Sequence, residues 1–582
     1  MKKTGARLLR HALEQLGIKY TFGIPGVHTT ELYDELANSD SVTPVLVTHE
    51  CGGAFMADAI SRTSDSIGTL LVVPAAGLTH AMSGIGEAFL DGVPMLVISG
   101  GIRTDTAHRY QLHDIDQAQL MKAVTKAQFK VTVHAELIPV IYEAHRIATT
   151  GEPGPVYVEI PMNIAAFTGE VESLPLAPPA SVRNEADIGI TPEEIRMAVA
   201  LLKTAKKPAI FAGWGARFCE HSLVALAELL NAPVATTLQG LSVFPGNHPL
   251  FAGFSFGPHA VPAADNAFRD CDCLIAIGTR FSEIPTGSYG LKVPENLIHI
   301  DINPEVFNAN YPAKMTLTGA AEHAVPMLHT ALHGSGYVSP VDGLALRTQI
   351  ERDRRAYQQE WFSHHSGDRV NPGRFFAALR EALKDDAIVV ADDGNHTFLT
   401  AELMPIHQSR HFISPTDFNC MGYCVPACIG AKLANPHQQV VGIVGDGAFL
   451  MTCMELLTAA TRHLGLVQFV FSDGELSQIS QTQEIPYNRK TCSVLGAVKL
   501  SGVADATGCA FLELHRNADI IPVIDEALNL ASIGKPVIVD VRIDYSKRTR
   551  FTKGIVMTTL KRFDVGTQMR FVGRALVRRV TG

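Results

Sequence analysis

Three aspartate residues in the last third of the chain could together hold a cation and a phosphate group. Asp393, Asp446 and Asp473 each follow a short apolar run, and each is followed by a glycine. The carboxyl ends of parallel strands meet at one edge of a sheet, so strands ending at these residues would gather three carboxylates there. Carboxylate oxygens suit a hard cation such as Mg²⁺, and a glycine lets the backbone approach a phosphate closely. The pattern predicts a magnesium-bridged phosphate ester or diphosphate, although a single Asp-Gly pair often marks only a turn.

The elements that must position these residues alternate along the chain. A helical pattern over Phe449–Arg462 follows the second aspartate, and its amino end would point toward a bound anion. Short β-branched runs separated by helical patterns predict an α/β fold of parallel sheets flanked by helices. These runs are Leu70–Pro74, Met95–Ser99 and Val156–Ile160 in the first third, and Ile388–Ala391, Val440–Val444, Val467–Phe471 and Val537–Val541 in the last third.

Two linkers divide the chain into three domains and a tail. One linker, over 174–190, contains three prolines, and the other, over 334–372, holds a Gly-Ser-Gly turn and a very polar helix around Glu351–Glu360. We therefore predict domains over 1–175, 190–335 and 370–545, each large enough to bury its own core, and a tail over 546–582. The first and third domains are predicted to share one architecture.

The composition of the 582-residue chain excludes several classes of protein. With 49 basic and 58 acidic residues, the net charge of −9 argues against a general nucleic-acid-binding protein. Because only 18% of the residues are charged and 46% are apolar, disorder as the main state is excluded. No apolar run reaches the roughly 18 residues of a membrane span, and the first residues have the spacing of an amphipathic helix rather than a signal peptide. We expect a soluble, cytoplasmic protein without a membrane or nucleic-acid partner.

The tail differs from the rest of the chain in its charge. From Lys547 to Gly582 there are ten Lys or Arg residues and one acid, Asp564, so this segment carries +9 and the rest of the chain −18. Apolar residues are interleaved with these charges, and a basic amphipathic tail can bind a membrane or nucleic acid. We favour the simpler interpretation that the tail packs on the chain's own acidic body or on a partner subunit.

Several ordered motifs resemble those of one enzyme family. Gly445-Asp446-Gly447, followed 27 residues after its Asp by Asp473, resembles the thiamine diphosphate motif, which opens with GDG and closes with a pair of Asn residues. The chain to about residue 545 is similar to the acetolactate synthase-like and 2-oxo acid decarboxylase family of thiamine diphosphate enzymes. The segments that carry this similarity are 20–26, 49–59 with its His-Glu pair, 154–161 and 421–431.

The resemblance implies a role for each matching residue of the third domain. Magnesium would be bound by the carboxylates of Asp446 and Asp473 and by the backbone carbonyl of Glu475. The diphosphate would contact residues from two segments, namely Gly445, Gly447 and Ala448, and Gly394, Asn395 and His396. Met421 would wedge between the two rings of the cofactor and hold it bent, although a Met is usually an ordinary core residue.

The resemblance also implies how the reaction begins. Glu50 would bond the aminopyrimidine ring nitrogen and favour the imino tautomer, whose nitrogen would act as an intramolecular base on the thiazolium carbon. The activated carbon would attack the keto group of a 2-oxo acid, which then loses carbon dioxide. In this family the Glu serves a cofactor bound by another chain, so the resemblance implies a homodimer or homotetramer.

Three positions depart from the family pattern. Asp473 stands where the family has the second Asn, which adds negative charge near the diphosphate. His113 stands where synthases have a Gln close to the cofactor, and His80 stands where many members have an Asn. Either histidine could donate a proton or contact the substrate carboxylate, because His titrates near neutral pH. The alternative for both is a hydrogen-bonded His without such a role; we expect His113 to be catalytic.

These observations lead to one prediction and three alternatives. We predict decarboxylation of a 2-oxo acid with carboligation to a second carbonyl compound, dependent on thiamine diphosphate and magnesium. A simple decarboxylase that releases an aldehyde is the first alternative, because His113 suits protonation of the carbon left after decarboxylation. Segments 253–259, 278–281 and 300–303 resemble those of flavin-containing relatives, but many relatives have no flavin. FAD therefore stays open, an FAD-dependent oxidase is the less favoured second alternative, and a non-catalytic scaffold protein is the third.

Overall fold

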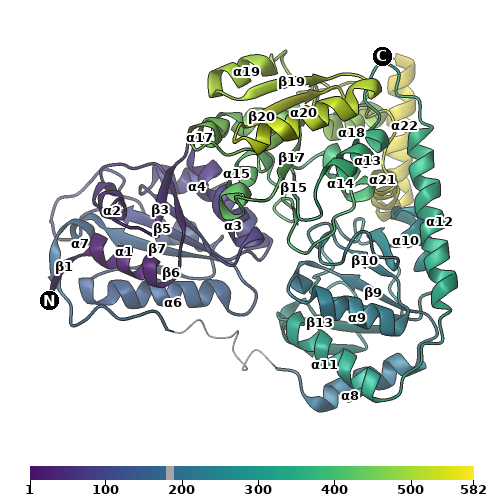
Figure 1. Cartoon of the computed structure of the whole chain (residues 1–582), viewed down its shortest axis with the longest axis horizontal. Coiled ribbons are helices and arrows are strands. Elements are labelled where there is room, and N and C mark those ends of the chain that lie inside the picture. Colours follow the sequence, from purple (N-terminus) through teal and green to yellow (C-terminus); the bar gives the residue numbers. More distant parts are fainter. Residues whose placement is uncertain (179–188, 582) are drawn as a thin grey trace.

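Three parallel β-sheets of six strands each form the framework of the computed structural model, which describes residues 1–178 and 189–581 (Figure 1). Helices flank each sheet, which confirms the predicted α/β class with three domains. The strands of the three sheets fall within the three predicted domains, and the domain boundaries themselves stay predictions. Most of the predicted linker over 174–190 lies outside the described residues.

The first sheet has the strand order β3-β2-β4-β5-β7-β6, and all its neighbouring strands are parallel. Its strands are β2 (Tyr20–Gly23), β3 (Thr43–Leu46), β4 (Gly68–Val72), β5 (Met95–Gly101), β6 (Gln128–Lys130) and β7 (Pro155–Pro161). The helices of this domain are α1 (Gly5–Gln15), α2 (Thr30–Leu36), α3 (Glu50–Thr63), α4 (Ala76–Leu90), α5 (Gln117–Met121), α6 (Leu137–Thr149) and α7 (Met162–Ala166). Strands β4, β5 and β7 are buried along their whole length, as expected for a parallel sheet that is covered on both faces. A short antiparallel pair, β1 (Lys2–Thr4) with β8 (Thr168–Glu170), joins the two ends of the domain.

The third sheet repeats the order of the first, β16-β15-β17-β18-β20-β19, which confirms the predicted likeness of the two domains. Its strands are β15 (Ile388–Ala391), β16 (Phe412–Ile413), β17 (Val440–Gly445), β18 (Val467–Phe471), β19 (Ala510–Leu514) and β20 (Val537–Val541). Helices α13 (Pro372–Ala382), α14 (Asn395–Leu403), α15 (Cys424–Ala434), α18 (Ser477–Tyr487), α19 (Leu500–Thr507) and α20 (Ile520–Ser532) connect them. All seven runs that we predicted as strands are strands of the first or third sheet.

The middle sheet has a different order, β11-β10-β9-β12-β13-β14, again with parallel neighbours. Its strands are β9 (Pro208–Ala212), β10 (Val234–Thr236), β11 (Phe251–Phe254), β12 (Cys273–Ile277), β13 (Asn296–Asp301) and β14 (Met315–Thr318). The main helices are α8 (Pro192–Thr204), α9 (Glu220–Leu230), α10 (Pro262–Ala267) and α11 (Ala321–Gly334). The polar helix predicted in the second linker is α12 (Gly343–Phe362), and it buries Ile350, Tyr357 and Trp361 against the body of the chain.

The helix predicted over Phe449–Arg462 is wrong as a single element. The chain instead forms α16 (Asp446–Thr452), a turn of 3₁₀-helix over Cys453–Glu455, and α17 (Leu456–Thr461). At the break, Thr452 donates a hydrogen bond to the carbonyl of Gly422 at 2.8 Å. Glu455 turns toward the first domain, where its carboxylate accepts from the backbone N–H of His49 at 2.9 Å. These two contacts with other parts of the fold outweigh the local helical pattern.

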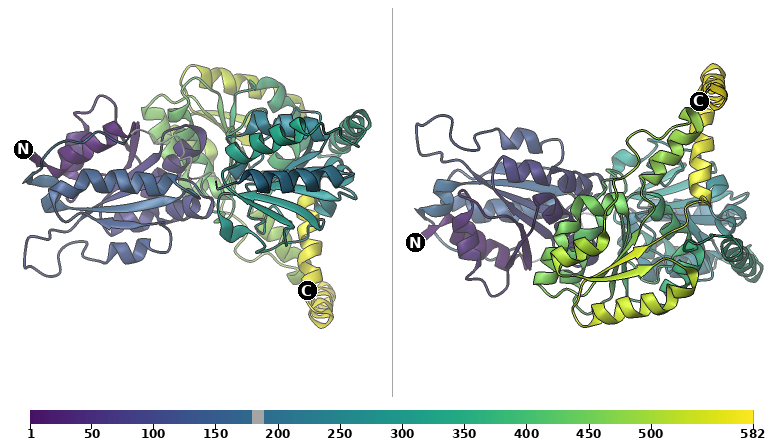
Figure 2. Two further views of the ribbon diagram at one scale, coloured as in Figure 1. Left: turned by 90° about the horizontal axis from the view of Figure 1, so that it is seen from below. Right: turned by 90° about the horizontal axis from the view of Figure 1, so that it is seen from above.

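The basic tail forms two helices, α21 (Arg550–Arg562) and α22 (Val565–Thr581). Phe551 is fully buried, and its ring centroid lies 4.6 Å from that of Phe254 and 4.9 Å from that of Phe398. Arg550 pairs with Glu360 at 2.8 Å. The start of the tail therefore packs on the chain's own body, as we favoured, whereas α22 stands out from it beside α18 (Figure 2). Neither these helices nor any other in the described part of the chain has the length and apolar character needed to cross a bilayer.

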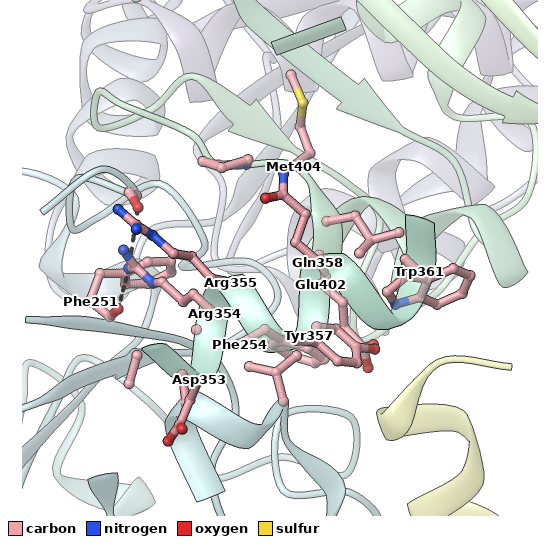
Figure 3. Close-up of a pocket in the computed structure, with 18 of the residues that line it drawn as sticks. Phe251, Phe254, Asp353, Arg354, Arg355, Tyr357, Gln358, Trp361, Glu402 and Met404 are labelled. Atoms are coloured by element: carbon pink, nitrogen blue, oxygen red, sulfur yellow. Dashed lines mark hydrogen bonds between the residues drawn. The ribbon is translucent and has the colours of Figure 1, made fainter. Parts of the chain in front are cut away.

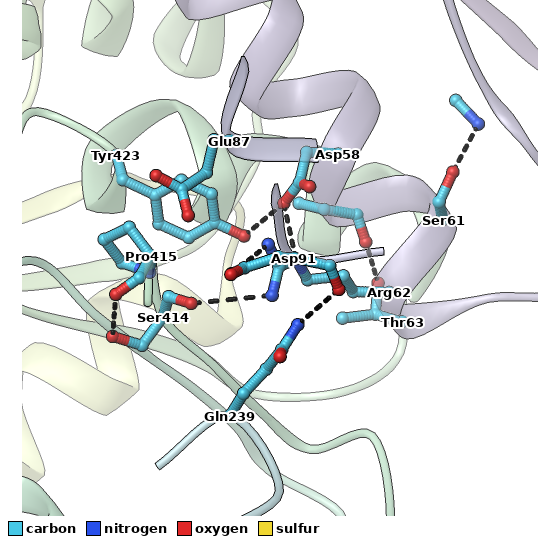
Figure 4. Close-up of polar contacts among 12 residues, drawn as sticks. Asp58, Ser61, Arg62, Thr63, Glu87, Asp91, Gln239, Ser414, Pro415 and Tyr423 are labelled. Atoms are coloured by element: carbon cyan, nitrogen blue, oxygen red, sulfur yellow. Dashed lines mark hydrogen bonds and ion pairs between the residues drawn. The ribbon is translucent and has the colours of Figure 1, made fainter. Parts of the chain in front are cut away.

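The first and third domains of one chain meet along α3 and α15. Arg62 of α3 is buried in this contact and pairs with Asp58 at 2.7 Å and with Asp91 at 2.9 Å (Figure 4). Tyr423 donates to Asp58 at 2.6 Å, and Gln239 of the middle domain donates to the carbonyl of Asp91 at 2.8 Å. Burial raises the pKa of Asp58, and the charge of Arg62 opposes that rise. This buried polar network joins all three domains and fixes α3 against the third one.

Candidate active site

A cavity of about 200 Å³ lies at the carboxyl edge of the third sheet. It is bordered by the segments that follow β15, β17 and β18, the strands that end beside the three predicted aspartates. Its lining includes every residue that we predicted to hold the diphosphate, the magnesium ion or the cofactor rings, except Glu50. These residues are Gly394, Asn395, His396, Met421, Gly445, Asp446, Gly447, Ala448, Asp473 and Glu475. The structure thus brings the set together, and their individual roles stay predictions.

Asp446 holds the loop after β17 against the loop after β18. One carboxylate oxygen accepts from the backbone N–H of Gly447 at 2.8 Å. The other accepts from the backbone N–H groups of Asp473 at 3.1 Å and Gly474 at 2.7 Å. Burial raises the pKa of Asp446, although these three hydrogen bonds oppose the rise. These hydrogen bonds hold the carboxylate in a fixed orientation.

Asp473 is oriented by Ser477, the first residue of α18, which donates to its carboxylate. Burial, aided by the negative charge of Asp446, raises the pKa of Asp473 to about 6. The side chain of Glu475 pairs with Lys490 at 2.6 Å, and this bond lowers the pKa of Glu475. The carboxylate of Glu475 is thus engaged by the lysine, and the predicted role of its backbone carbonyl stays a prediction.

His396 is buried between two glycine-containing loops at the same edge. A Cβ at Gly394 would lie 2.7 Å from the His396 ring, and a Cβ at Gly445 would lie 3.1 Å from it. Gly394 also has a φ of +147°, which L side chains rarely adopt. Burial lowers the pKa of His396 to about 3, so the ring is neutral at pH 7. Its Nε2 atom is buried without a hydrogen-bond partner among the described residues, although it lines the cavity edge where an anion is predicted.

Met421 reaches the cavity from the turn before α15, and this turn is fastened by Asp392. The two carboxylate oxygens of Asp392 accept from the backbone N–H groups of Gly422 at 2.9 Å and Cys424 at 2.8 Å. Burial raises the pKa of Asp392 to about 7. Asp392 was not among the predicted site residues, and its only signal in the sequence is its position directly before Asp393.

Glu50 lies in the first domain as the initial residue of α3 and does not line the cavity. Its carboxylate is buried, and Oε2 lies 3.0 Å from His80 Nδ1. A Cβ at Gly77 would lie 3.0 Å from Glu50 Oε1, so a glycine there leaves room for the carboxylate. The structure therefore joins Glu50 to one of the two histidines that depart from the family pattern.

His113, the other histidine, lies beside His28 rather than beside Glu50. The two ring centroids are 5.2 Å apart, and the Nδ1 atoms of both rings are buried without a partner among the described residues. Burial, and then the nearby His113, lower the pKa of His28. His113 has a backbone φ of +68°, which is uncommon for a residue with a side chain. His28 was not among the predicted site residues, and its only signal in the sequence is its place in the segment that follows β2.

The third-domain residues fit a diphosphate bound through a divalent cation. Asp446 and Asp473 are partly buried oxygen donors, and burial raises the pKa of both; a bound Mg²⁺ would favour their ionised forms. His396 lines the same cavity, and its Nε2 is buried without a hydrogen-bond partner among the described residues. The glycines at 394, 445 and 447 leave the backbone close to the cavity.

Two other cavities contain none of the predicted site residues. The larger, of about 240 Å³, lies beneath α12 and is lined by Arg354, Tyr357, Trp361 and Glu402 among others (Figure 3). The smaller, of about 80 Å³, lies at the carboxyl edge of the middle sheet, where Arg280 takes part in ion pairs.

Two of the flavin-like segments, 278–281 and 300–303, line small cavities at the carboxyl edge of the middle sheet, and FAD binding stays an open prediction. These cavities measure about 60 and 80 Å³, and segment 253–259 contributes Gly253 and Phe254 to the cavity of about 240 Å³ beneath α12. Arg280 lines the larger of these two edge cavities and pairs with Glu152 at 3.2 Å and Asp417 at 2.6 Å. The flavin-like segment 253–259 is covered by α21, through the contact of Phe551 with Phe254.

Three family models for thiamine pyrophosphate enzymes match the chain in order; thiamine pyrophosphate is another name for thiamine diphosphate. The N-terminal TPP binding domain matches residues 3–120, and the central domain matches residues 195–328. The C-terminal TPP binding domain matches residues 392–541, which contain the cavity loops.

The chain is also similar over most of its length to acetolactate synthase large subunits. It is 29% identical to the acetolactate synthase isozyme 3 large subunit of Escherichia coli, over 94% of this chain and 95% of that protein. It is 32% identical to the probable acetolactate synthase large subunit of Methanocaldococcus jannaschii, over 84% of this chain and 83% of that protein. The acetolactate synthase large subunit of Haemophilus influenzae is 29% identical, over 94% of this chain and 96% of that protein. The chain therefore belongs to the acetolactate synthase-like family of thiamine diphosphate-dependent enzymes.

Proposed function

We propose that the chain decarboxylates a 2-oxo acid and joins the remaining carbon unit to a second carbonyl compound, with thiamine diphosphate and Mg²⁺ as cofactors. The observation that carries this proposal is the cavity in which two aspartates, a buried histidine and the glycine loops meet. The similarity to acetolactate synthase large subunits supports the carboligation step. The bound cofactor would supply a carbon nucleophile that can hold the electron pair released with carbon dioxide.

In this proposal the residues of the third domain bind the cofactor and hold it in place. Asp446 and Asp473 bind the cation with their carboxylates, and Glu475 adds its backbone carbonyl. The diphosphate is bound by backbone N–H groups and by one histidine, from Gly394, Asn395, His396, Gly445, Gly447 and Ala448. Met421, which also lines the cavity, would support the bend between the two rings of the cofactor.

The residues of the first domain move protons in this proposal. Glu50 exchanges a proton with the aminopyrimidine ring nitrogen. His113 and its neighbour His28 face the reacting carbon or the substrate carboxylate. If His113 delivers a proton to that carbon, an aldehyde leaves and the enzyme is a simple decarboxylase. This second candidate is favoured by the unpartnered ring nitrogens of both histidines.

A second copy of the chain completes the site in this proposal. None of the residues that line the cavity comes from the first domain, whereas Glu50 does. The carboxyl edge of the first sheet also exposes an apolar set, namely Val27, Leu46, Tyr110, Leu112 and Ile115. Exposed apolar side chains at this edge favour an interaction surface here, and the third domain of a partner would cover them and bring Glu50 to the cofactor.

Subunit complementation tests this arrangement. A Glu50→Gln chain and an Asp446→Ala chain, carrying different tags and expressed together, would each be inactive alone. The mixed dimer would contain one intact site, so a random mixture should recover about a quarter of the wild-type activity. No recovery in purified mixed dimers would contradict the shared site.

Product analysis tests the proposed reaction. The protein would be incubated with thiamine diphosphate, Mg²⁺ and ¹³C-labelled pyruvate, then with further 2-oxo acids, each with and without an aldehyde acceptor. We expect NMR to detect a 2-hydroxy ketone or an acetohydroxy acid. An aldehyde as the only product would favour the decarboxylase, and hydrogen peroxide formation by a yellow protein would favour the oxidase.

We keep a cytoplasmic location as a prediction.

A further inference from the structure

Glu50 has a single hydrogen-bonding side-chain partner within the described residues. That partner is His80, whose Nδ1 lies 3.0 Å from Glu50 Oε2. An ionised carboxylate can only accept a hydrogen bond, so His80 must carry its proton on Nδ1 when this bond forms. The Glu50 side chain is only 7% exposed, whereas that of His80 is 52% exposed. His80 therefore covers one oxygen of a largely buried carboxylate, and Gly77 lies beside the other oxygen.

His80 is itself held in place by its neighbours. Its ring stacks on that of His49, with a centroid distance of 4.7 Å and an interplanar angle of 23°. His49 is fixed in turn because its Nδ1 accepts from the backbone N–H of Cys51 at 3.2 Å and so caps α3. The two stacked histidine rings are thus held in place over the first turn of α3.

The backbone conformation at the start of α4 places His80 within hydrogen-bonding distance of Glu50. Ala75, just before this helix, has a φ of +54°, a conformation that costs an alanine backbone strain. Gln117 stabilises it, because its side-chain oxygen accepts from the Ala75 backbone N–H at 3.1 Å. The strained turn lets Gly77 pass beside Glu50 Oε1 and places His80 one turn later.

We propose that His80 is a positioning residue that orients the Glu50 carboxylate and stabilises its ionised form. This inference rests on the proposed function, in which Glu50 gives a proton to the aminopyrimidine ring nitrogen. An N–H donor on Oε2 favours the carboxylate that remains after that transfer and leaves Oε1 free to face the ring. His80 then acts through Glu50 and is not the donor of a proton to substrate.

Two substitutions of His80 distinguish its role as a hydrogen-bond donor to Glu50 from a role of its ring as an acid. In His80→Ala the donor is lost. In His80→Asn the amide Nδ2 stands at the same number of bonds from Cα as the histidine Nδ1, so it can donate to Oε2, but it cannot act as an acid. His437→Ala is a matched control, because His437 is exposed and precedes β17 at the opposite edge of the third sheet.

The experiment measures two properties of bound cofactor besides turnover. Calorimetry gives the dissociation constant of thiamine diphosphate with Mg²⁺, and quenched NMR sampling gives the rate of deuterium exchange at the thiazolium C2 position. For His80→Ala we expect a dissociation constant close to that of the wild type and an exchange rate lower by about tenfold or more. His80→Asn should recover most of the exchange rate, and His437→Ala should match the wild type.

Several results would overturn the proposal. Unchanged exchange in His80→Ala would remove the positioning role, and equal loss in the Ala and Asn variants would show that the imidazole ring itself is needed. Thermal unfolding of each variant excludes a folding defect, and His80→Asn remains informative if His80→Ala does not fold. If the wild type neither binds thiamine diphosphate nor accelerates its exchange, the proposed function fails instead, and the two failures are distinguishable.

Discussion

The carboxylate of Glu455 accepts hydrogen bonds from the backbone N–H groups of His49, at 2.9 Å, and of Thr48, at 3.1 Å. Glu455 belongs to the third domain, whereas His49 directly precedes Glu50 in the first. The close approach requires Gly52, because a Cβ there would lie 2.4 Å from Glu455 Oε1. Each chain thus uses its own third domain to fix the start of α3, and with it the residue proposed to serve the partner's cofactor.

Replacing Glu50 by Gln should separate cofactor binding from catalysis. Gln keeps the shape and can still contact the ring nitrogen, but it cannot exchange a proton there. We expect calorimetry to give a nearly unchanged dissociation constant for thiamine diphosphate, while turnover falls by about 10²–10⁴-fold. Glu31→Gln, at an exposed position on α2, should behave like the wild type. Near-normal turnover in Glu50→Gln would contradict a mechanism in which Glu50 exchanges a proton with the aminopyrimidine ring.

Asp473→Asn tests the extra negative charge at the metal loop. Asn keeps an oxygen ligand but removes one charge from a site that must also accept a diphosphate. At saturating Mg²⁺ we expect the variant to bind thiamine diphosphate up to about tenfold more tightly, as measured by calorimetry at two Mg²⁺ concentrations. Asp446→Ala, which also removes the bridge to Gly474, should abolish binding. Weaker cofactor binding by Asp473→Asn at saturating Mg²⁺ would argue against this view of the charge.

The sequence predicted the three aspartates, their shared sheet edge and the likeness of the first and third domains. It could do so because buried parallel strands are β-branched runs and their ends are marked by Asp-Gly pairs. It could not predict the break in the helix after Asp446. The backbone N–H groups that bind the Glu455 carboxylate belong to the first domain and lie some 400 residues earlier in the chain. The contact of His80 with Glu50 was missed for the same reason, since it depends on how α3 and α4 pack.

Arg62→Met should destabilise the contact between the first and third domains. The change leaves two buried carboxylates, Asp58 and Asp91, without their counter-charge, which costs about 3–5 kcal/mol. Chemical unfolding should show a clear fall in the midpoint. Arg103→Met, which breaks the exposed pair with Asp105, should leave the midpoint unchanged. Equal midpoints for the two variants would mean that the buried network contributes no net stability.

Phe551→Ala tests whether the tail is part of the folded body. The ring is fully buried between two phenylalanines of different domains, so its removal should cost about 3–5 kcal/mol of unfolding free energy. Met569→Ala, at a position that is 67% exposed on α22, is the matched control and should change little. A wild-type unfolding curve for Phe551→Ala would show that α21 is not held in this contact in solution.

The release of carbon dioxide from a 2-oxo acid tests the central claim most directly, because carboligation and simple decarboxylation both require it. Protein stripped of metal and cofactor would be given [1-¹³C]pyruvate, or another acid from the panel, and labelled carbon dioxide and bicarbonate would be followed by NMR. We predict saturable release only when thiamine diphosphate and Mg²⁺ are both present. Release at the same rate without thiamine diphosphate, or no release from any acid with both cofactors present, would contradict the account.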